Sequence, residues 1–368
     1  MQISTISSKS IDFCRTILCM QVVFYHMATT APVPQEALLK GTIYGTLILF
    51  ITMLNNIAVP MFFTISGYLL AANFKPTWKG YVKTMHKKII RLGQPLLIWT
   101  SVFLVLYYIA QQLPATAPLF SGENELIRHY NGMDYIDAYV GFRSGFTFVG
   151  QYWFLRNLLI LCFFSPLLMR FYRHTRLTGF LVTLAGCIVL RFVNLYIADS
   201  IFFFSTGLYM ATDEKTVSFI ADKVRPVAVL FAAFTILCFI GFSVPSLAWL
   251  YNGLFYFYVL TGFIVISYVV RRMLAKNLGN KVLLLAGGSY FVFLIHQQIL
   301  MFLKRVVYKM LPIDTAFEVF IAYLLTPVII IVMAYVVYFL LKKYTPRLLN
   351  VLTGKTGLLS FHSLKKTL

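Results

Sequence analysis

The sequence predicts an all-α polytopic membrane protein with about ten transmembrane helices. Of its 368 residues, 60% are hydrophobic and 12% are charged, and the mean hydropathy is +0.79. Charged residues make up about 25% of a typical soluble chain, roughly twice this share. The apolar stretches are long enough to cross ~30 Å of hydrocarbon, where a helix satisfies its own backbone hydrogen bonds. These observations together predict a bundle of membrane-spanning helices.

The ten predicted spans are apolar stretches that end at polar, charged or proline-containing segments. The first span, 10–31, leads into a turn that contains two prolines. The region 42–73 is too long for one span and is interrupted at Asn55, Asn56 and Pro60, so we expect a partly embedded segment at 42–54 and then the second span. The other spans are expected at 93–113, 147–169, 177–197, 199–212, 227–245, 247–270, 286–303 and 319–341.

Lysine and arginine are unevenly distributed over the connections between these spans. The richer connections are 75–91, 170–176, 215–225, 271–281 and the chain from 342 onward. By the positive-inside rule these connections face the cytoplasm, which places both termini there and requires an even number of spans. We therefore expect a membrane domain over 1–345 and a short basic cytoplasmic tail over 346–368. Three outer basic residues run against the rule and would bind an anion or reach lipid headgroups: Lys304, Arg305 and Lys309.

The charge and the cysteines exclude several classes of site. The formal net charge of +20 does not predict a nucleic-acid partner, because the charges lie in short segments between apolar spans. The five cysteines all lie in apolar stretches without a Cys-x-x-Cys pair, which favours small core residues over disulfides or a metal site. We therefore expect no metal cofactor. Lys9 leads directly into the first span without a cleavage site, so that span is expected to stay.

Polar residues in the first span mark a candidate active site. Asp12, Arg15 and His26 lie in this apolar stretch, where a charged side chain near the bilayer centre costs about 2.5–3.5 kcal/mol. Arg15 and His26 are eleven positions apart, which puts them on one helix face about 16 Å apart along the axis. Histidine is the usual general base near neutral pH. The alternative is a structural polar pair, and Asp12 is placed to pair with Arg15.

A second candidate site is the basic cluster of Lys87, Lys88 and Arg91. Lys88 and Arg91 are three positions apart and would share a face of an α-helix. Cations at a fixed spacing favour phosphate groups, so this cluster is a candidate seat for a phosphorylated cytosolic ligand. Ordinary positive-inside charge explains the same residues equally well.

Five sequence blocks together resemble the integral-membrane acyltransferase family 3. The first span, with Arg, ten residues and then His, resembles the opening motif of that family. Four further blocks follow in the family's order and resemble its second span, its basic cytoplasmic motif, its Trp-Phe-Leu span and its late Tyr/His span: VPMFFTISGYLL (59–70), KKIIRLGQP (87–95), QYWFLRNLLILCFFSPLL (151–168) and SYFVFLIHQQIL (289–300).

The resemblance implies a ten-helix enzyme of the bacterial inner membrane. In that family the membrane domain moves an acyl group, commonly acetyl from acetyl-CoA, onto glycans at the outer face. His26 would be the catalytic histidine and Arg15 its essential partner. Lys88 and Arg91, with Lys87 beside them, match the Arg-x-x-Arg motif that faces the cytosolic donor. The first position is Lys here, which keeps the charge but lacks the planar fork of Arg.

Four further residues in these blocks are candidates for binding the acceptor: Trp153, Arg156, His296 and Ser66. The Trp153 ring would stack on a sugar or, like its neighbour Tyr152, anchor the helix at the membrane interface. Arg156 would contact the acceptor or tie two helices together. His296 is either a second polar site residue or a buried histidine with internal partners. Ser66 precedes a glycine, and such small pairs favour close helix packing.

We therefore predict a membrane O-acyltransferase that moves acetyl from acetyl-CoA to a bacterial surface polysaccharide, O-antigen-like, or to its lipid-linked precursor. Its partners would be that glycan and the membrane lipids. The main alternative is a transporter or flippase for a lipid-linked glycan, with Arg15 and His26 as a proton relay. No internal repeat is evident, which counts against a transporter built from duplicated halves.

Overall fold

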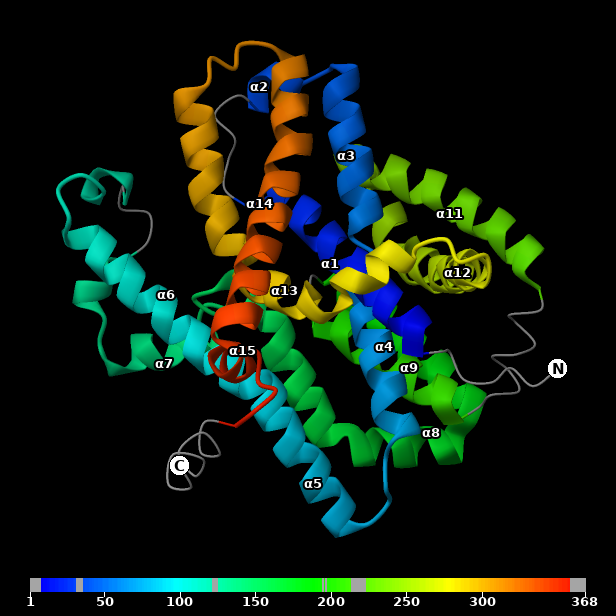
Figure 1. Cartoon of the computed structure of the whole chain (residues 1–368). Helices are drawn as coiled ribbons and strands as arrows, with labels where there is room; N and C mark the ends of the chain where they lie inside the picture. Colours follow the sequence, from blue (N-terminus) through cyan, green and yellow to red (C-terminus); the bar gives the residue numbers. More distant parts are fainter. Residues whose placement is uncertain are drawn as a thin grey trace. The chain divides into compact units, whose positions relative to one another are not determined.

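The computed structural model describes residues 8–30, 36–120, 125–193, 195, 197–212 and 223–357. Every regular element within these ranges is helical, as predicted (Figure 1). The α-helices are α1 (Ser8–Thr29), α2 (Glu36–Leu39), α3 (Ile43–Asn55), α4 (Ala58–Ala72), α5 (Trp78–Lys88), α6 (Gln94–Gln112), α7 (Gly132–Val140), α8 (Trp153–Phe192), α9 (Ile197–Thr212), α11 (Val224–Ser243), α12 (Ala248–Ala275), α13 (Asn280–Met310), α14 (Ala316–Tyr344) and α15 (Pro346–Leu352).

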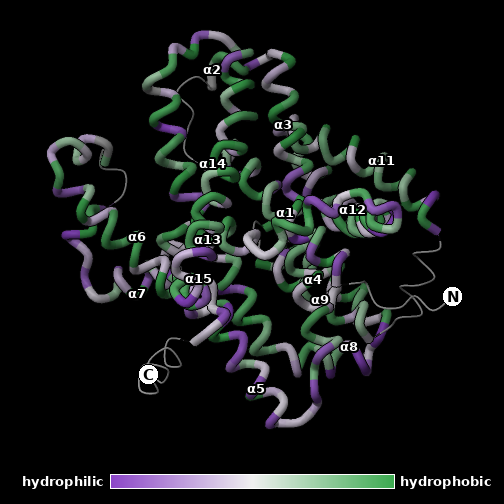
Figure 2. The backbone as a smooth tube through the Cα atoms, viewed as in Figure 1, coloured by the Kyte–Doolittle hydropathy of each residue, from purple (hydrophilic) through white to green (hydrophobic). Residues whose placement is uncertain are grey.

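The helices are long and apolar enough for a multi-pass membrane protein. Seven segments of the described chain qualify as membrane spans by length and composition: Ile43–Ala72, Trp78–Gln112, Gly150–Phe192, Val224–Ser243, Pro245–Ala275, Asn280–Tyr308 and Ala316–Tyr344. Figure 2 shows hydrophobic residues along most of α11 and α14. The first predicted span forms α1 but is not among the seven, and α9 has only 16 residues. The count of ten and the cytoplasmic termini stay predictions.

Two predicted interruptions are present in the structure. α3 ends at Asn55 and α4 begins at Ala58, so the apolar region 42–73 is divided where its polar residues predicted. Within α8, Arg176 has φ 47° and ψ −128°, far from helical values. The element therefore consists of two helical segments, as the separate spans predicted at 147–169 and 177–197 require.

The chain divides into two compact units, and each is described by itself. The first unit comprises Met1–Lys75 and Leu161–Tyr335, and the second comprises Pro76–Ile160 and Val336–Leu368. The first unit contains His26 and its surroundings, and the second contains the basic cluster of Lys87, Lys88 and Arg91.

In the first unit, α4 and α9 touch through their backbones. A Cβ atom added at Gly67 would collide with the carbonyl oxygen of Phe204, and one at Gly207 would collide with that of Thr64. Only glycine allows this approach at either position, since any other side chain would push the helices apart. The close-packing role predicted for the small pair at the end of the second span is thereby confirmed at Gly67.

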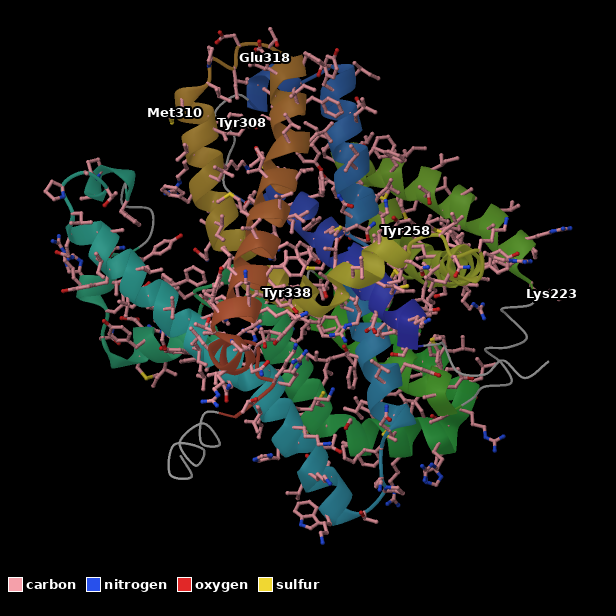
Figure 3. All side chains as sticks on the ribbon, in the orientation of Figure 1. Lys223, Tyr258, Tyr308, Met310, Glu318 and Tyr338 are labelled. Carbon is pink, nitrogen blue, oxygen red and sulfur yellow. The ribbon has the colours of Figure 1, made fainter. Side chains whose placement is uncertain are left out.

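The connection between α13 and α14 is fixed by a capping box. Thr315 Oγ1 accepts a hydrogen bond from the Glu318 N–H (3.3 Å), and the Glu318 carboxylate accepts one from the Thr315 N–H (2.9 Å). Figure 3 labels Tyr308, Met310 and Glu318 in this region. Beside it, Ile313, Val319 and Ala322 form a small apolar core, against which Leu39, Val307 and Tyr308 pack.

Candidate active site

α1 carries the predicted catalytic face on one unbroken helix. Arg15 and His26 are both half-buried and lie within Ser8–Thr29. The helical geometry assumed for their eleven-residue spacing therefore holds. The ion pair predicted between Asp12 and Arg15 is wrong: the ion pairs among the described residues are Arg143–Asp134 and Arg191–Asp199. Asp12 is exposed near the start of the helix, where solvation leaves such a pair little to gain.

His26 faces a second histidine, His296 of α13. The two ring centroids are 5.4 Å apart and the ring planes are inclined by 40°. His296 is fully buried, and its Nδ1 lies 2.8 Å from the carbonyl oxygen of Phe293. A carbonyl only accepts hydrogen bonds, so Nδ1 of His296 carries the hydrogen and Nε2 is left as an acceptor.

Two imidazole nitrogens of this pair are buried without a hydrogen-bond partner. They are Nδ1 of His26 and Nε2 of His296, within the part of the chain that the structure describes. Buried polar atoms in native proteins are normally hydrogen-bonded, so two such atoms on facing rings are an exception that needs a cause. A shared proton, a water molecule or a substrate group between the rings would satisfy both. The sequence pointed to each histidine separately, but their contact depends on the fold.

α1 and α13 run parallel, and three contacts follow one another along them. Cys19 Sγ donates to the carbonyl oxygen of Ser289 (3.0 Å), His26 faces His296, and Lys304 Nζ donates to the carbonyl oxygen of Met27 (2.8 Å). Residue numbers rise together on the two helices, which establishes their common direction. Two membrane-spanning helices run parallel to each other when an odd number of spans separates them in the sequence.

Lys304 is a residue of this region that sequence reasoning placed wrongly. Its side chain is 4% exposed, and Nζ donates to the carbonyl oxygens of Met27 and Thr30, each at 2.8 Å. It therefore binds the end of α1 rather than an external anion or a lipid headgroup. The one signal in the sequence was its departure from the positive-inside rule.

Ser66 lies on α4 in the same unit and is half-buried. None of the contacts described for this unit joins it to His26. Among the predicted residues of this unit, the structure thus brings together His26 and His296.

A buried ionic network in the first unit was missed by the sequence analysis. Arg191 of α8 is 4% exposed and pairs with Asp199 of α9. Tyr256 Oη donates to Asp199 Oδ1 at 2.7 Å, and the Arg191 guanidinium lies 3.8 Å from the centroid of the Phe255 ring. The signal was available, because Arg191 lies inside the predicted span 177–197 and Asp199 begins the next one, eight positions later.

This network extends through Tyr251 to Asn56, in the break between α3 and α4. Arg191 lies 5.4 Å from the ring centroid of Tyr251, whose hydroxyl accepts a hydrogen bond from Asn56 Nδ2 at 2.5 Å. Asn56, one of the two asparagines that interrupt the region 42–73, therefore takes part in a buried polar network.

In the second unit, the basic cluster lies at a break in the α-helical geometry. Lys87 is exposed and Lys88 ends α5, while Arg91 lies in the π-helical turn Ile89–Gly93. A π-helical turn contains an extra residue and is frequent at functional sites. The regular α-helical geometry assumed for the spacing of Lys88 and Arg91 therefore does not extend to Arg91.

Arg91 also has a structural partner in α15. Its Nη1 donates to the carbonyl oxygen of Thr353 (3.2 Å), Gln94 donates to that of Val351 (2.8 Å), and Trp99 donates to that of Leu352 (3.1 Å). These carbonyls lie at the C-terminal end of α15, where the last carbonyls of a helix accept hydrogen bonds from groups outside it. The start of the predicted tail is thus a helix that packs on α6.

Arg156 of α8 is a tie within the second unit. Its Nη1 donates to the carbonyl oxygens of Val140 (2.6 Å) and Gly141 (3.0 Å), at the end of α7. Of the two predicted roles, the structural one is confirmed. The neighbouring Trp153 begins α8 and is half-buried. Tyr152 is fully buried, so its predicted role as an exposed interfacial anchor is wrong.

The comparisons with known proteins agree with the resemblance of the motifs. The chain is similar to the succinoglycan biosynthesis protein ExoH of Rhizobium meliloti (strain 1021), with 28% identity over 367 residues, 95% of this chain and 93% of that protein. No solved structure gives a significant match. The family described as Acyltransferase domain matches residues 8–351. Since that match spans nearly the whole chain, the protein belongs to the membrane acyltransferase family 3 that its motifs resemble.

Proposed function

We propose that the protein is an inner-membrane O-acetyltransferase of a bacterial surface polysaccharide, O-antigen-like, or of its lipid-linked precursor. Family membership supports acyl transfer, and the relative named for succinoglycan biosynthesis supports a polysaccharide acceptor. The single observation that carries the proposal is the pair of facing histidines, His26 and His296, each with a buried nitrogen that lacks a partner.

His26 acts as the general base in this proposal. The Nδ1–H of His26 is held by Nε2 of His296, directly or through one water, and this leaves Nε2 of His26 to accept the proton of a sugar hydroxyl. The hydroxyl oxygen attacks the thioester carbonyl, the C–S bond breaks, and the imidazolium returns its proton to the CoA thiolate. A brief acyl-imidazole on His26 is the other route that the same residue allows.

His296 orients His26 because its own tautomer is fixed. The Phe293 carbonyl accepts from Nδ1 of His296, so only Nε2 can receive a hydrogen bond from His26. In this chain the Phe293 carbonyl fixes His296, and His296 orients His26. A third residue orients the general base of a hydrolase triad in a similar way. Arg15 places a cation three turns from His26 on the same helix, and we assign it as the partner of the catalytic histidine.

The proposed donor is acetyl-CoA, and its phosphates are assigned to the cluster of Lys87, Lys88 and Arg91. Their positive charge supports this assignment, and so does the π-helical turn at Arg91. Trp153 and Ser66 stay proposed contacts of the acceptor. Arg156 is better explained by its bonds to the end of α7.

The proposal is tested by acetyl transfer in cells that lack the native gene. Wild type and His26→Ala are compared at matched membrane levels, with His174→Ala, an exposed histidine of the same unit, as the control. Base-labile acetyl groups on the glycan are measured by mass spectrometry before and after mild alkali. We expect acetylation with wild type and the control, and none with His26→Ala.

Two results would contradict the proposal in different ways. Full acetylation by His26→Ala would remove His26 from the site. No acetylation with wild type would reject this donor and acceptor, and proteoliposomes would then test the rival function. A flippase moves a lipid-linked glycan without an acyl donor, whereas the transferase consumes acetyl-CoA.

A further inference from the structure

Lys304 lies where a charged side chain is costly. It belongs to α13, within the segment Asn280–Tyr308 that qualifies as a membrane span, and its side chain is 4% exposed. Removing an ammonium group from water costs several kcal/mol unless hydrogen bonds compensate it. The two bonds from Nζ to the carbonyl oxygens of Met27 and Thr30, each 2.8 Å long, supply that compensation. The ammonium group of Lys304 is thus bound to the carbonyl groups at the end of α1.

The carbonyls that Lys304 binds belong to the turn that carries His26. The last carbonyls of a helix have no partner inside it, and the helix dipole gives this end a partial negative charge. Thr30 Oγ1 also donates to the carbonyl oxygen of His26 at 2.5 Å. The backbone around His26 is therefore held by Thr30 and by a cation of the neighbouring helix.

α13 supplies both groups that define the surroundings of His26. His296 and Lys304 are eight residues apart in this helix, a spacing that keeps them on one broad helix stripe. One contacts the His26 ring and the other contacts the following backbone. The distance between these two contacts is set by a rigid helix.

We propose that Lys304 is a positioning residue for His26: by holding the carbonyls of Met27 and Thr30, it fixes the last turn of α1 and aims the His26 ring at His296. This inference rests on the proposed function in so far as His26 is the base. Lys304 itself touches neither donor nor acceptor in this scheme. Without it, two carbonyls at membrane depth lose their donor, and the turn relaxes away from α13.

Three substitutions separate the charge of Lys304 from its hydrogen bonds. Lys304→Met removes both, Lys304→Gln keeps N–H donors without the charge, and Lys304→Arg keeps charge and donors. Arg305→Met is the matched control, because Arg305 is the adjacent basic residue and is exposed. Purified full-length protein in nanodiscs is assayed for kcat and for KM of acetyl-CoA. The rate of His26 modification by diethyl pyrocarbonate, followed by mass spectrometry, gives a readout that does not need activity.

We expect Lys304→Met to lower kcat by about 10²-fold, since a base misplaced by about 1 Å costs that much, with the KM of acetyl-CoA nearly unchanged. His26 should react faster with the reagent in this variant, and Lys304→Arg should restore both values. Equal His26 reactivity in wild type and Lys304→Met would overturn the proposal, even if kcat fell. If Lys304→Met does not accumulate, Lys304→Gln takes its place, since its shorter and uncharged side chain holds the two carbonyls more weakly; His26 reactivity equal to that of wild type in Lys304→Gln would then overturn the proposal.

The measurement of His26 reactivity also tests the positioning role of Lys304 separately from the proposed transferase function. If wild type transfers no acetyl, the proposed function fails. The effect of Lys304→Met on His26 modification still decides whether the lysine positions that ring.

Discussion

Tyr256 donates a 2.7 Å hydrogen bond to Asp199, the carboxylate that pairs with the buried Arg191. The three side chains come from α12, α9 and α8, and so they join three helices of the first unit at one point. Hydrogen bonds and the Phe255 ring surround the ions, which is the condition under which a buried ion pair is tolerated. This arrangement makes each partner dependent on the other.

Breaking this pair from one side should destabilise the protein strongly. Arg191→Met leaves the Asp199 carboxylate without its cation, and Asp199→Leu leaves the buried guanidinium without its anion. We expect each variant to lose about 3–5 kcal/mol of unfolding free energy, and the double variant Arg191→Met/Asp199→Leu to lose less than either. Denaturant unfolding in micelles measures these values.

The matched control is the other ion pair among the described residues, Arg143–Asp134. It is exposed, with 55% of the Arg143 side chain accessible, so Arg143→Met should change stability by about 1 kcal/mol or less. If the double variant loses as much as the sum of the two single variants, the two ions act independently and the network described here is not a unit.

Substitution of His296 should affect turnover more than donor binding. In the proposed function, His296 accepts the hydrogen of His26 Nδ1 and holds the ring in place. We expect His296→Ala to lower kcat by about 10²-fold, within the range for a disturbed general base, and to change the KM of acetyl-CoA little. The measurement is steady-state acetyl transfer. A fall in donor affinity with unchanged kcat would instead assign His296 to the binding of the donor.

The helices and their interruptions could be predicted because they depend on local sequence. Apolar runs fix the long helices, and polar residues inside the region 42–73 fix the break between α3 and α4. Arg15 and His26 share a helix face for the same local reason. The contact of His26 with His296 could not be predicted, because 270 residues separate them and no repeat or spacing links α1 to α13.

Two other features lay beyond the sequence for the same physical reason. The π-helical turn at Ile89–Gly93 lies against α15, where the Gly354 backbone packs on the carbonyl of Ile90. Local helix propensity does not predict that contact, because α15 is distant in the sequence. The hydrogen bonds that Lys304 donates to the end of α1 also depend on contact between helices distant in the sequence. The departure of Lys304 from the positive-inside rule marks it as unusual in the sequence, but it does not identify the carbonyl groups that the lysine binds.

Gly354 should be intolerant of any side chain. It is the left-handed residue (φ 61°) after α15, and the Lys355 N–H bonds to the Asn350 carbonyl at 2.8 Å, as in a Schellman cap. A Cβ atom there would collide with the Ile90 carbonyl. We expect Gly354→Ala to cost about 1–3 kcal/mol through strain and to release α15 from α6.

Amide hydrogen exchange in α15 measures this effect, because released carbonyls leave the helix end unprotected. Gly132→Ala is the control in the same unit, since nothing lies within 4 Å of a Cβ atom at that position. If α15 exchanges equally slowly in wild type and in Gly354→Ala, the helix is not held by the contact at Gly354.

Acid should loosen the loop after α7 through Asp137. The Asp137 carboxylate accepts hydrogen bonds from the N–H groups of Arg143 (2.7 Å) and Ser144 (3.3 Å), and these bonds hold the pKa of Asp137 below its ordinary value of 3.8. A carboxyl group whose pKa is depressed on folding stabilises the fold above its unfolded pKa. That contribution is lost as the pH falls through the lower, folded value.

A nitroxide label at Phe146→Cys, an exposed position in this loop, reports the change. The label should be restricted at neutral pH and should become mobile only below about pH 4, the ordinary range of an aspartate. Asp137→Asn keeps the shape of the side chain but weakens the acceptor, so the label should already be mobile at neutral pH and should respond little to acid. Asp134→Asn is the comparison, since that carboxylate also bonds to Arg143 but through its side chain (3.1 Å). If acid mobilises the label equally in wild type and in Asp137→Asn, the loop is held by other contacts and its acid response belongs to another group.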